Sequence, residues 1–423
     1  MAEPAAAARA QIPRWRVRHL LRAPHRLGFF LGTLVLLAAG GWWAAVQLMR
    51  AGLGAAPAAA VPVSLVHAAA MTFGFMPLFF AGFLFTAVPK WLRVPPPPTG
   101  RLAAPLLAQA AGAMAWLAGS HVHRLAACAG LAVATAGLVG VTVRYARMLR
   151  ASAQADRLHA GLIGLALAFG CVCLAAAAAS TAAGWDRAAS AWVRSGFWGF
   201  VVMVFLCVSH RLIPFFTCDA FPTSRRFGAS WSLWAMLGLA ALEAAAELLD
   251  AAGGRSTVRE VLLGAVEWAA GAGTIWLCVR WGRTQNLAVR WVGMLHLGFV
   301  WLGLALVLGG AARLLSAQTG AVHLPLGALH AVAMGSLGSL MLAMVARISM
   351  AHSGRPVRAE GLLTGVFRAL QVATLLRLAA TLPWPHAQGI IAFAALAWFT
   401  LTLFWGTRHV YWYGLPRADG RPG

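Results

Sequence analysis

Long apolar stretches alternate with short basic connections along almost the whole chain. A helix needs about 20 apolar residues to cross the core of a bilayer, and twelve stretches are long enough. They predict an all-α fold, a polytopic transmembrane helical bundle in which the lipid bilayer is the solvent. The predicted spans lie at about 27–49, 62–88, 102–119, 124–143, 158–183, 191–210, 228–249, 259–279, 287–312, 325–346, 362–382 and 387–407. We therefore expect a basic tail over 1–26, a single transmembrane domain over 27–407 and a short tail over 408–423.

The distribution of basic residues predicts how these spans are oriented. Of the 34 Lys and Arg residues, 25 fall in the two tails and the alternate connections on their side, and 8 fall on the opposite side. Loops rich in Lys and Arg stay in the cytoplasm, so both termini are expected to be cytoplasmic. The first apolar stretch is too long for the core of a signal peptide, so we expect it to be retained as the first span.

Composition excludes several function classes. Only 11% of the residues are charged and 61% are hydrophobic, whereas a soluble domain carries about 25% charged residues. The net charge of +23 comes from arginines spread between apolar runs, which is typical of topology signals, so nucleic acid is not an expected partner. The six cysteines form no Cys-x-x-Cys motif, so neither a disulfide framework nor a zinc site is predicted.

Two distant segments share a histidine pattern. His67 begins His-Ala-Ala-Ala-Met71 and His330 begins His-Ala-Val-Ala-Met334, each near the start of a span that runs from outside to inside. Both histidines are therefore expected about 8 Å below the outer interface. Imidazole nitrogen is a ligand for iron and copper, and equal depth predicts one shared site. The alternative is that each histidine hydrogen-bonds to a neighbouring helix, with the methionines as packing residues.

A second group of histidines is expected toward the cytoplasmic side. His159 begins the fifth span, His210 ends the sixth, and His352 follows the tenth, while His296 lies deeper in the ninth. Two layers of imidazoles, one in each leaflet, would suit two metal centres.

Acidic residues are rare in this chain, and three that fall inside predicted spans stand out. Glu243 and Glu247 share one face near the outer end of the seventh span, and Glu267 lies near the middle of the eighth. Ionisable residues at membrane depth mark a pathway or a partner. One interpretation is proton delivery from outside to a buried catalytic site, and the other is pairing with an arginine or hydrogen bonding between helices.

Three arginines lie near the ends of spans. Arg211 and Arg347 are on the cytoplasmic side and Arg377 is near an outer end. A guanidinium binds carboxylates through two parallel hydrogen bonds, so haem propionates are candidate partners. Snorkelling to the interface is the alternative.

These motifs together resemble the NnrS family. The similarity runs from about residue 24 to the end, and the segments that carry it are His67-Ala-Ala-Ala-Met-Thr-Phe-Gly-Phe75, Ala81–Trp91, Arg211-Leu-Ile-Pro-Phe-Phe-Thr217, Leu295-His-Leu-Gly298, Leu329–Arg347, His352-Ser-Gly-Arg-Pro356 and Pro416–Pro422. The resemblance implies a twelve-span protein of the bacterial cytoplasmic (inner) membrane that binds haem b, with copper as a further metal, and that is linked to nitric oxide. By position, the family histidines correspond to His67, His296, His330 and His352.

The chain departs from the family pattern in its second span. Ala69 and Ala70 stand where a second histidine and a glutamate are expected, and Lys90 stands where an asparagine is usual. His210 occupies a position where the family often has glycine. The resemblance therefore leaves open whether one metal site is altered, with His210 as a replacement ligand.

Two functions follow as hypotheses. The first is a haem protein, or haem–copper protein, that acts on nitric oxide by reduction or by binding and detoxification. Reduction would take electrons from an unidentified donor, a quinol or a cytochrome, and protons along Glu243, Glu247 and Glu267. The alternative is a transporter of a metal or small solute with structural histidines, because twelve spans and 45 glycines suit helices that pack closely and rock against each other.

Overall fold

The computed structural model describes residues 14–55, 58–220, 230–254, 256–283, 287–324, 326–359 and 361–421, without the side chains of 214–220 and 230. Pro422, the last residue of the C-terminal motif, and the side chains of 214–217 therefore lie outside the description. Within it, twelve helices are long and apolar enough to cross a membrane, each overlaps one predicted span, and no strand occurs. The all-α prediction is confirmed.

The elements are η1 (Val17–Arg22), α1 (Pro24–Arg50), α2 (Val63–Ala69), η2 (Ala70–Gly74), α3 (Met76–Leu92), α4 (Thr99–Gly119), α5 (Arg124–Arg150), α6 (Leu158–Ala182), α7 (Asp186–Gly196), η3 (Phe197–Val202), α8 (Met203–Ala220), α9 (Ser230–Gly253), α10 (Thr257–Gly282), α11 (Arg290–Thr319), α12 (Gly327–His330), η4 (Ala331–Gly338), α13 (Ser339–His352), α14 (Gly361–Ala379) and α15 (Ala387–Tyr413).

Three spans form the inner layer of the bundle. They are α2–η2–α3, α7–η3–α8 and α12–η4–α13. In their most apolar stretches, 83%, 83% and 72% of the residues are buried, whereas this share does not exceed 56% in any other described span. Each of the three contains a π-helical segment: η2, η3 and η4. Such wide turns are rare in helices and occur frequently at functional sites, so these three spans are where a site is to be sought.

The three inner spans meet near the middle of the bundle. Side chains of α3, α8 and α13, with Phe29 from α1, line a small apolar cavity of about 50 Å³. Its walls include Met76, Phe80, Phe205 and Met341. The mostly apolar side chains around this cavity pack the inner spans against each other through shape and dispersion.

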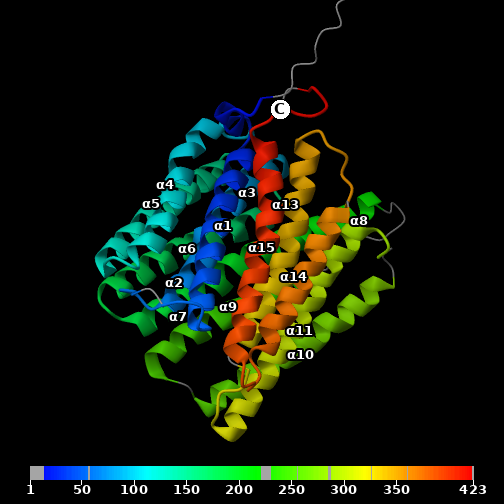
Figure 1. Cartoon of the computed structure of the whole chain (residues 1–423). Helices are drawn as coiled ribbons and strands as arrows, with labels where there is room; N and C mark the ends of the chain where they lie inside the picture. The colour runs from blue at the N-terminus through cyan, green and yellow to red at the C-terminus, as the bar shows by residue number, and fades with distance from the viewer. Residues whose placement is uncertain are drawn as a thin grey trace, which may run out of the picture.

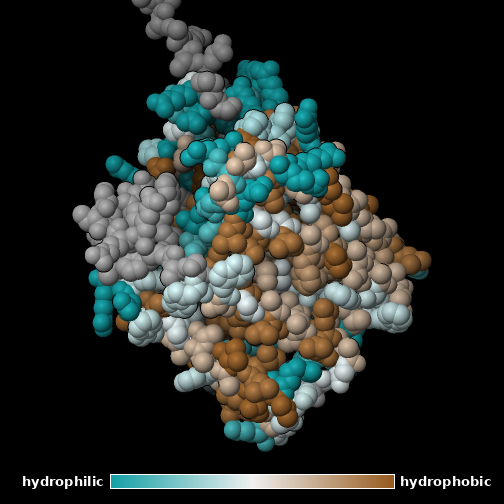
Figure 2. Space-filling view, turned by 180° about the vertical axis from the view of Figure 1, so that it is seen from behind, coloured by the Kyte–Doolittle hydropathy of each residue, from teal (hydrophilic) through white to brown (hydrophobic). Residues whose placement is uncertain are grey.

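The outer surface matches a lipid environment. Figure 2 shows hydrophobic side chains over the middle of the visible face, with hydrophilic ones gathered toward the end that carries the termini. Large apolar side chains such as Leu165, Val172, Trp268 and Phe404 are exposed. In water such a surface would drive aggregation, so we place this protein in a membrane, which it crosses many times.

The two tails lie together at one end of the bundle (Figure 1). The ring Nδ1 of His19 lies 2.7 Å from the carbonyl oxygen of Gly414, and Arg26 donates to the carbonyl oxygen of Leu415 at 2.7 Å. Arg417 donates to the carbonyl of His352 and holds the pKa of Asp419 down to about 2. The described parts of both tails therefore lie at the same end of the bundle, and the cytoplasmic identity of that end stays a prediction.

Helices α4 and α5 approach each other closely through glycines. A Cβ atom added at Gly130 would lie 2.5 Å from the backbone nitrogen of Trp116 and 2.9 Å from the carbonyl oxygen of Gly112. Neither backbone group can yield without moving a helix. In membranes, small residues allow this approach, and the packing it permits drives helix association.

We expect Gly130→Ala to lower the free energy of unfolding by about 1–3 kcal/mol, the usual penalty for overpacking. Thermal unfolding of the detergent-solubilised protein, followed by tryptophan fluorescence, measures the effect. The matched control is Gly161→Ala in α6, where an added Cβ meets nothing within 4 Å and helix propensity favours alanine. Equal melting temperatures for the two variants would contradict the close-approach argument.

Candidate functional site

His67 and His330 come together at the end of the bundle away from the termini. Each lies within the first five residues of an inner span, His67 in α2 and His330 as the last residue of α12. The two imidazoles are close enough to interact electrostatically, and Arg377 of α14 is close enough to interact with both. Two residues 263 positions apart in the sequence thus lie within electrostatic range of each other.

Both rings have a nitrogen that a ligand could use. The ring of His67 stacks on Trp43, with centroids 3.9 Å apart, and its Nδ1 is buried without a hydrogen-bond partner among the described residues. The Nδ1 of His330 lies 2.8 Å from the carbonyl oxygen of Leu326. A carbonyl only accepts, so Nδ1 carries the proton and Nε2 keeps its lone pair. Two imidazoles in this state are a donor set suited to iron.

In a regular α-helix, the methionine of each His-x-x-x-Met pattern would lie directly above its histidine, but both methionines lie in π-helical segments. Met71 lies in η2 and Met334 in η4. In a π turn the hydrogen bond runs to the fifth residue, so the fourth residue no longer lies directly above the first. Both methionines pack against the hydrophobic core, which is the packing role that the sequence offered as the alternative.

The remaining candidate histidines lie toward the other end of the bundle. Nε2 of His159 in α6 is 3.1 Å from Nδ1 of His210 in α8. The ring of His352 in α13 lies 4.6 Å from that of His25 in α1, measured between centroids, and Nδ1 of His25 is buried without a partner among the described residues. His296 in α11 joins neither pair. No group of three or more His, Cys, Asp or Glu side chains suited to a metal ion gathers within the described part of the chain.

His25 was assigned to the N-terminal tail from the sequence, although it lies inside the first span. The signal that could have placed it is Pro24, because proline is favoured at the first position of a helix. Helix α1 begins at that proline, which puts His25 within the first turn.

The three candidate propionate partners are spread over the molecule. Arg211 lies 3.4 Å from Asp156 and 5.0 Å above the ring of Trp91. Arg347 lies in α13, about 25 Å along the span from His330 at 1.5 Å per residue. Arg377 is the one of the three that the structure places beside His67 and His330.

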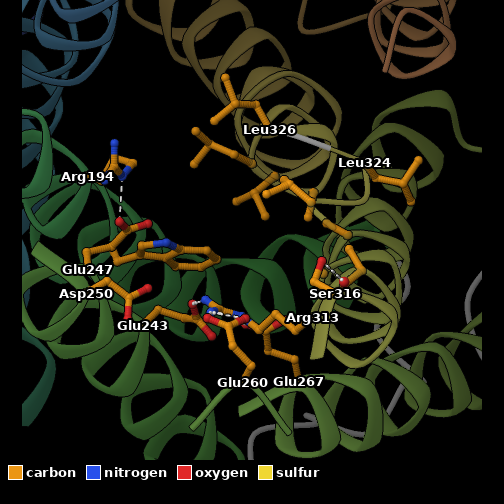
Figure 3. A pocket seen from close by; sticks show the side chains of 18 of the residues that line it. Arg194, Glu243, Glu247, Asp250, Glu260, Glu267, Arg313, Ser316, Leu324 and Leu326 are labelled. Atoms are coloured by element: carbon orange, nitrogen blue, oxygen red, sulfur yellow. Dashed lines mark hydrogen bonds and ion pairs between the residues drawn. The ribbon is translucent and has the colours of Figure 1, made fainter. Parts of the chain in front are cut away.

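A polar pocket of about 460 Å³ lies between α7, α9, α10, α11 and α12 (Figure 3). At its base, the guanidinium of Arg313 from α11 is surrounded by carboxyl groups. Its Nε donates to Glu267 at 2.6 Å and one Nη to Glu243 at 3.0 Å, and the other Nη lies 3.5 Å from Glu260. All three glutamates are buried.

The remaining acids of the pocket have arginines of their own. Glu247 accepts from Arg194 at 2.5 Å, and Asp250 pairs with Arg259. Pairing with arginine, one of the two interpretations drawn from the sequence, is therefore present for Glu243, Glu247 and Glu267.

Sequence reasoning missed the arginine at the centre of this cluster. Arg313 was counted in a loop after a span ending at 312, but α11 continues to Thr319. Leu314 and Leu315 directly after it continue the apolar run, and this is the signal that could have extended the span.

The comparison with known proteins agrees with this architecture. A family model described as NnrS protein matches residues 19–417, which include both histidine pairs, His67, His330 and the carboxylate cluster. No curated protein and no solved structure matches the chain.

Proposed function

Because the chain belongs to the NnrS family, we propose that it is a membrane haem protein that binds nitric oxide, with His67 and His330 as the protein ligands of a haem b. Membership of this family and the twelve-helix fold fit a membrane protein linked to nitric oxide. The observation that carries the finer proposal is the meeting of these two imidazoles from two inner spans. Each has a nitrogen that could bind iron.

The residues around the pair fit a haem. The orphaned Nδ1 of His67 needs a partner, and burying a polar atom without one is unfavourable. Trp43, stacked on His67, fixes the orientation of the imidazole ring. Arg377 provides the positive charge that a propionate requires. When bound, the haem would supply an iron that passes electrons while both histidines hold it, and that takes up nitric oxide where one of them leaves it.

Copper has candidate donors at the opposite end of the bundle. The pairs His159–His210 and His25–His352 each bring two imidazoles from different helices together, and imidazole suits copper. His296 would add a donor only after a rearrangement that brings it to one of these pairs. We assign copper, if bound, to these pairs rather than to the pair formed by His67 and His330.

Reduction of nitric oxide is the more demanding version of the proposal. It requires an electron donor, a quinol or a cytochrome, and a supply of protons. Leu329 and Val332, which flank His330, also line the acidic pocket, so carboxyl groups lie near the helix that carries one proposed ligand. Binding and detoxification require only the haem.

The test is the absorption spectrum of the purified protein in detergent before and after dithionite, and again after anaerobic addition of nitric oxide. We expect a Soret band that shifts on reduction and shifts further with nitric oxide. Elemental analysis on the same sample measures iron and copper. Absence of both a Soret band and iron would refute the haem proposal and leave the transporter hypothesis as the better one.

A further inference from the structure

The cluster around Arg313 has more negative groups than positive ones. Glu243, Glu260 and Glu267 are 2%, 5% and 4% exposed, and one guanidinium faces all three. Glu243 and Glu267 both bind this guanidinium, and if both were ionised, these three groups would carry a net charge of −1 in a buried setting. Ionised groups removed from water are strongly unfavourable unless they are paired, so this cluster must take up positive charge from elsewhere.

The arrangement of Glu243 and Glu267 indicates that the additional positive charge is located at these two carboxyl groups. One carboxyl oxygen of Glu243, Oε2, accepts from Arg313, whereas Oε1 is buried and has no donor within reach among the described residues. The carboxyl groups of Glu267 and Glu243 bind the same guanidinium, at Nε and at one Nη, which places the two side by side. Two carboxylates can only accept, so they repel at this distance unless one of them carries a proton.

We propose that Glu243 is a proton-binding site, a carboxylic acid that shares its proton with Glu267 at the base of the pocket. Glu267 is the ionised partner because it receives the shortest contact from Arg313, 2.6 Å. A metal ion is a poorer occupant, since no group of three or more suitable side chains gathers to hold one in the described part of the chain. The proton comes from the aqueous medium and returns to it, so no other reactant is required.

The other carboxylates that face the pocket are already balanced. From α7, Arg194 pairs with Glu247 and Arg187 donates to the carbonyl oxygen of Asp250. The carboxylate of Asp250 pairs with Arg259. The ring of His323 bonds to Thr319. The excess of acid is thus confined to the Arg313 cluster.

The pocket also provides the route for the proton. Its rim includes Arg187 and His323, near the ends of spans on the side away from the termini, and its inner wall includes Leu329 and Val332 next to His330. Glu243 lines the same pocket. A proton held there therefore shares one cavity with exposed Arg187 and with the segment of the proposed haem ligand. The inference itself does not require a bound haem.

Infrared spectroscopy tests the proposal on the full-length protein in detergent, with or without haem. At neutral pH we expect the carbonyl stretch of a protonated carboxylic acid, shifted in D₂O. Glu243→Gln should remove it, while Glu247→Gln, whose carboxylate has its own arginine, should retain it. Glutamine is nearly isosteric with the protonated acid and its amide can donate to Glu267, so Glu243→Gln is expected to elute and melt like the unaltered protein.

Glu267→Gln gives a second measurement that holds even if Glu243→Gln does not fold. With a neutral neighbour, Glu243 can ionise beside Arg313, so the band should disappear here too. Absence of the band from the unaltered protein, or its persistence in either Glu243→Gln or Glu267→Gln, would overturn the proposal. None of these outcomes bears on whether haem is bound, which the Soret band decides separately.

Discussion

Changing either His67 or His330 to alanine is expected to remove one and the same haem absorption band from the purified protein. The two imidazoles come from different inner spans and lie within electrostatic range of each other, so a haem held by both would lose one of its protein ligands in either variant. Loss of an outer-shell partner of a metal ligand weakens metal affinity by roughly 10–100-fold. Loss of a ligand itself should lower haem occupancy by at least that factor.

His386→Ala is the matched control, because His386 is an exposed histidine at the same end of the bundle. Added imidazole should partly restore the band in His67→Ala and in His330→Ala by filling the space that the side chain leaves. Loss of different bands in the two variants would assign the histidines to separate sites. An unchanged spectrum in both would remove them from the haem site altogether.

Arg313→Met is expected to be the most destabilising single change in the acidic pocket. It leaves Glu243, Glu260 and Glu267 buried without the guanidinium that contacts all three. Removing one partner of a buried ion pair typically costs about 3–5 kcal/mol. The measurement is the melting temperature in detergent, read from the fraction of protein that survives heating as a monodisperse peak in size-exclusion chromatography.

Two further variants separate the loss of charge pairing from a general effect of mutation. Arg187→Met removes an arginine at the rim, where its side chain donates to a backbone carbonyl, and should change stability by no more than about 1 kcal/mol. Combining Arg313→Met with Glu267→Gln should recover part of the lost stability, because the double variant removes the carboxylate of Glu267 together with the guanidinium that paired with it. A melting temperature for Arg313→Met equal to that of Arg187→Met would show that the cluster is not held by its arginine.

Twelve spans could be predicted from the sequence because lipid imposes a simple requirement, a long apolar segment with its backbone bonded within itself. The ends of the spans were harder to predict. Hydropathy treats every arginine as a residue of the interface, so it ended the ninth span before Arg313. The structure buries that guanidinium among carboxylates from α9 and α10, a partnership that no local pattern reveals.

The sequence could predict how deep in the membrane the candidate site lies, but not which helices surround it. Topology places His67 and His330 at one depth, but hydropathy does not say which spans are inner or which are neighbours. The pairing of His352 with His25 joins the tenth span to the first, and the sequence contains no signal for that contact. Trp43 and Arg377 could not be predicted as part of the site either, because they reach it through packing between helices that are distant in the chain.

The wide turns of the inner spans divide each of these helices into two halves that differ in phase. One additional residue in a turn rotates everything beyond it by about 100° relative to a regular helix. In α2–η2–α3 and α12–η4–α13 this offset falls just after the histidine. The half that carries the imidazole and the half that packs in the centre of the bundle therefore present faces that are set independently. A ring near the membrane surface can be aimed at a ligand without reorienting the apolar contacts deeper in the same helix.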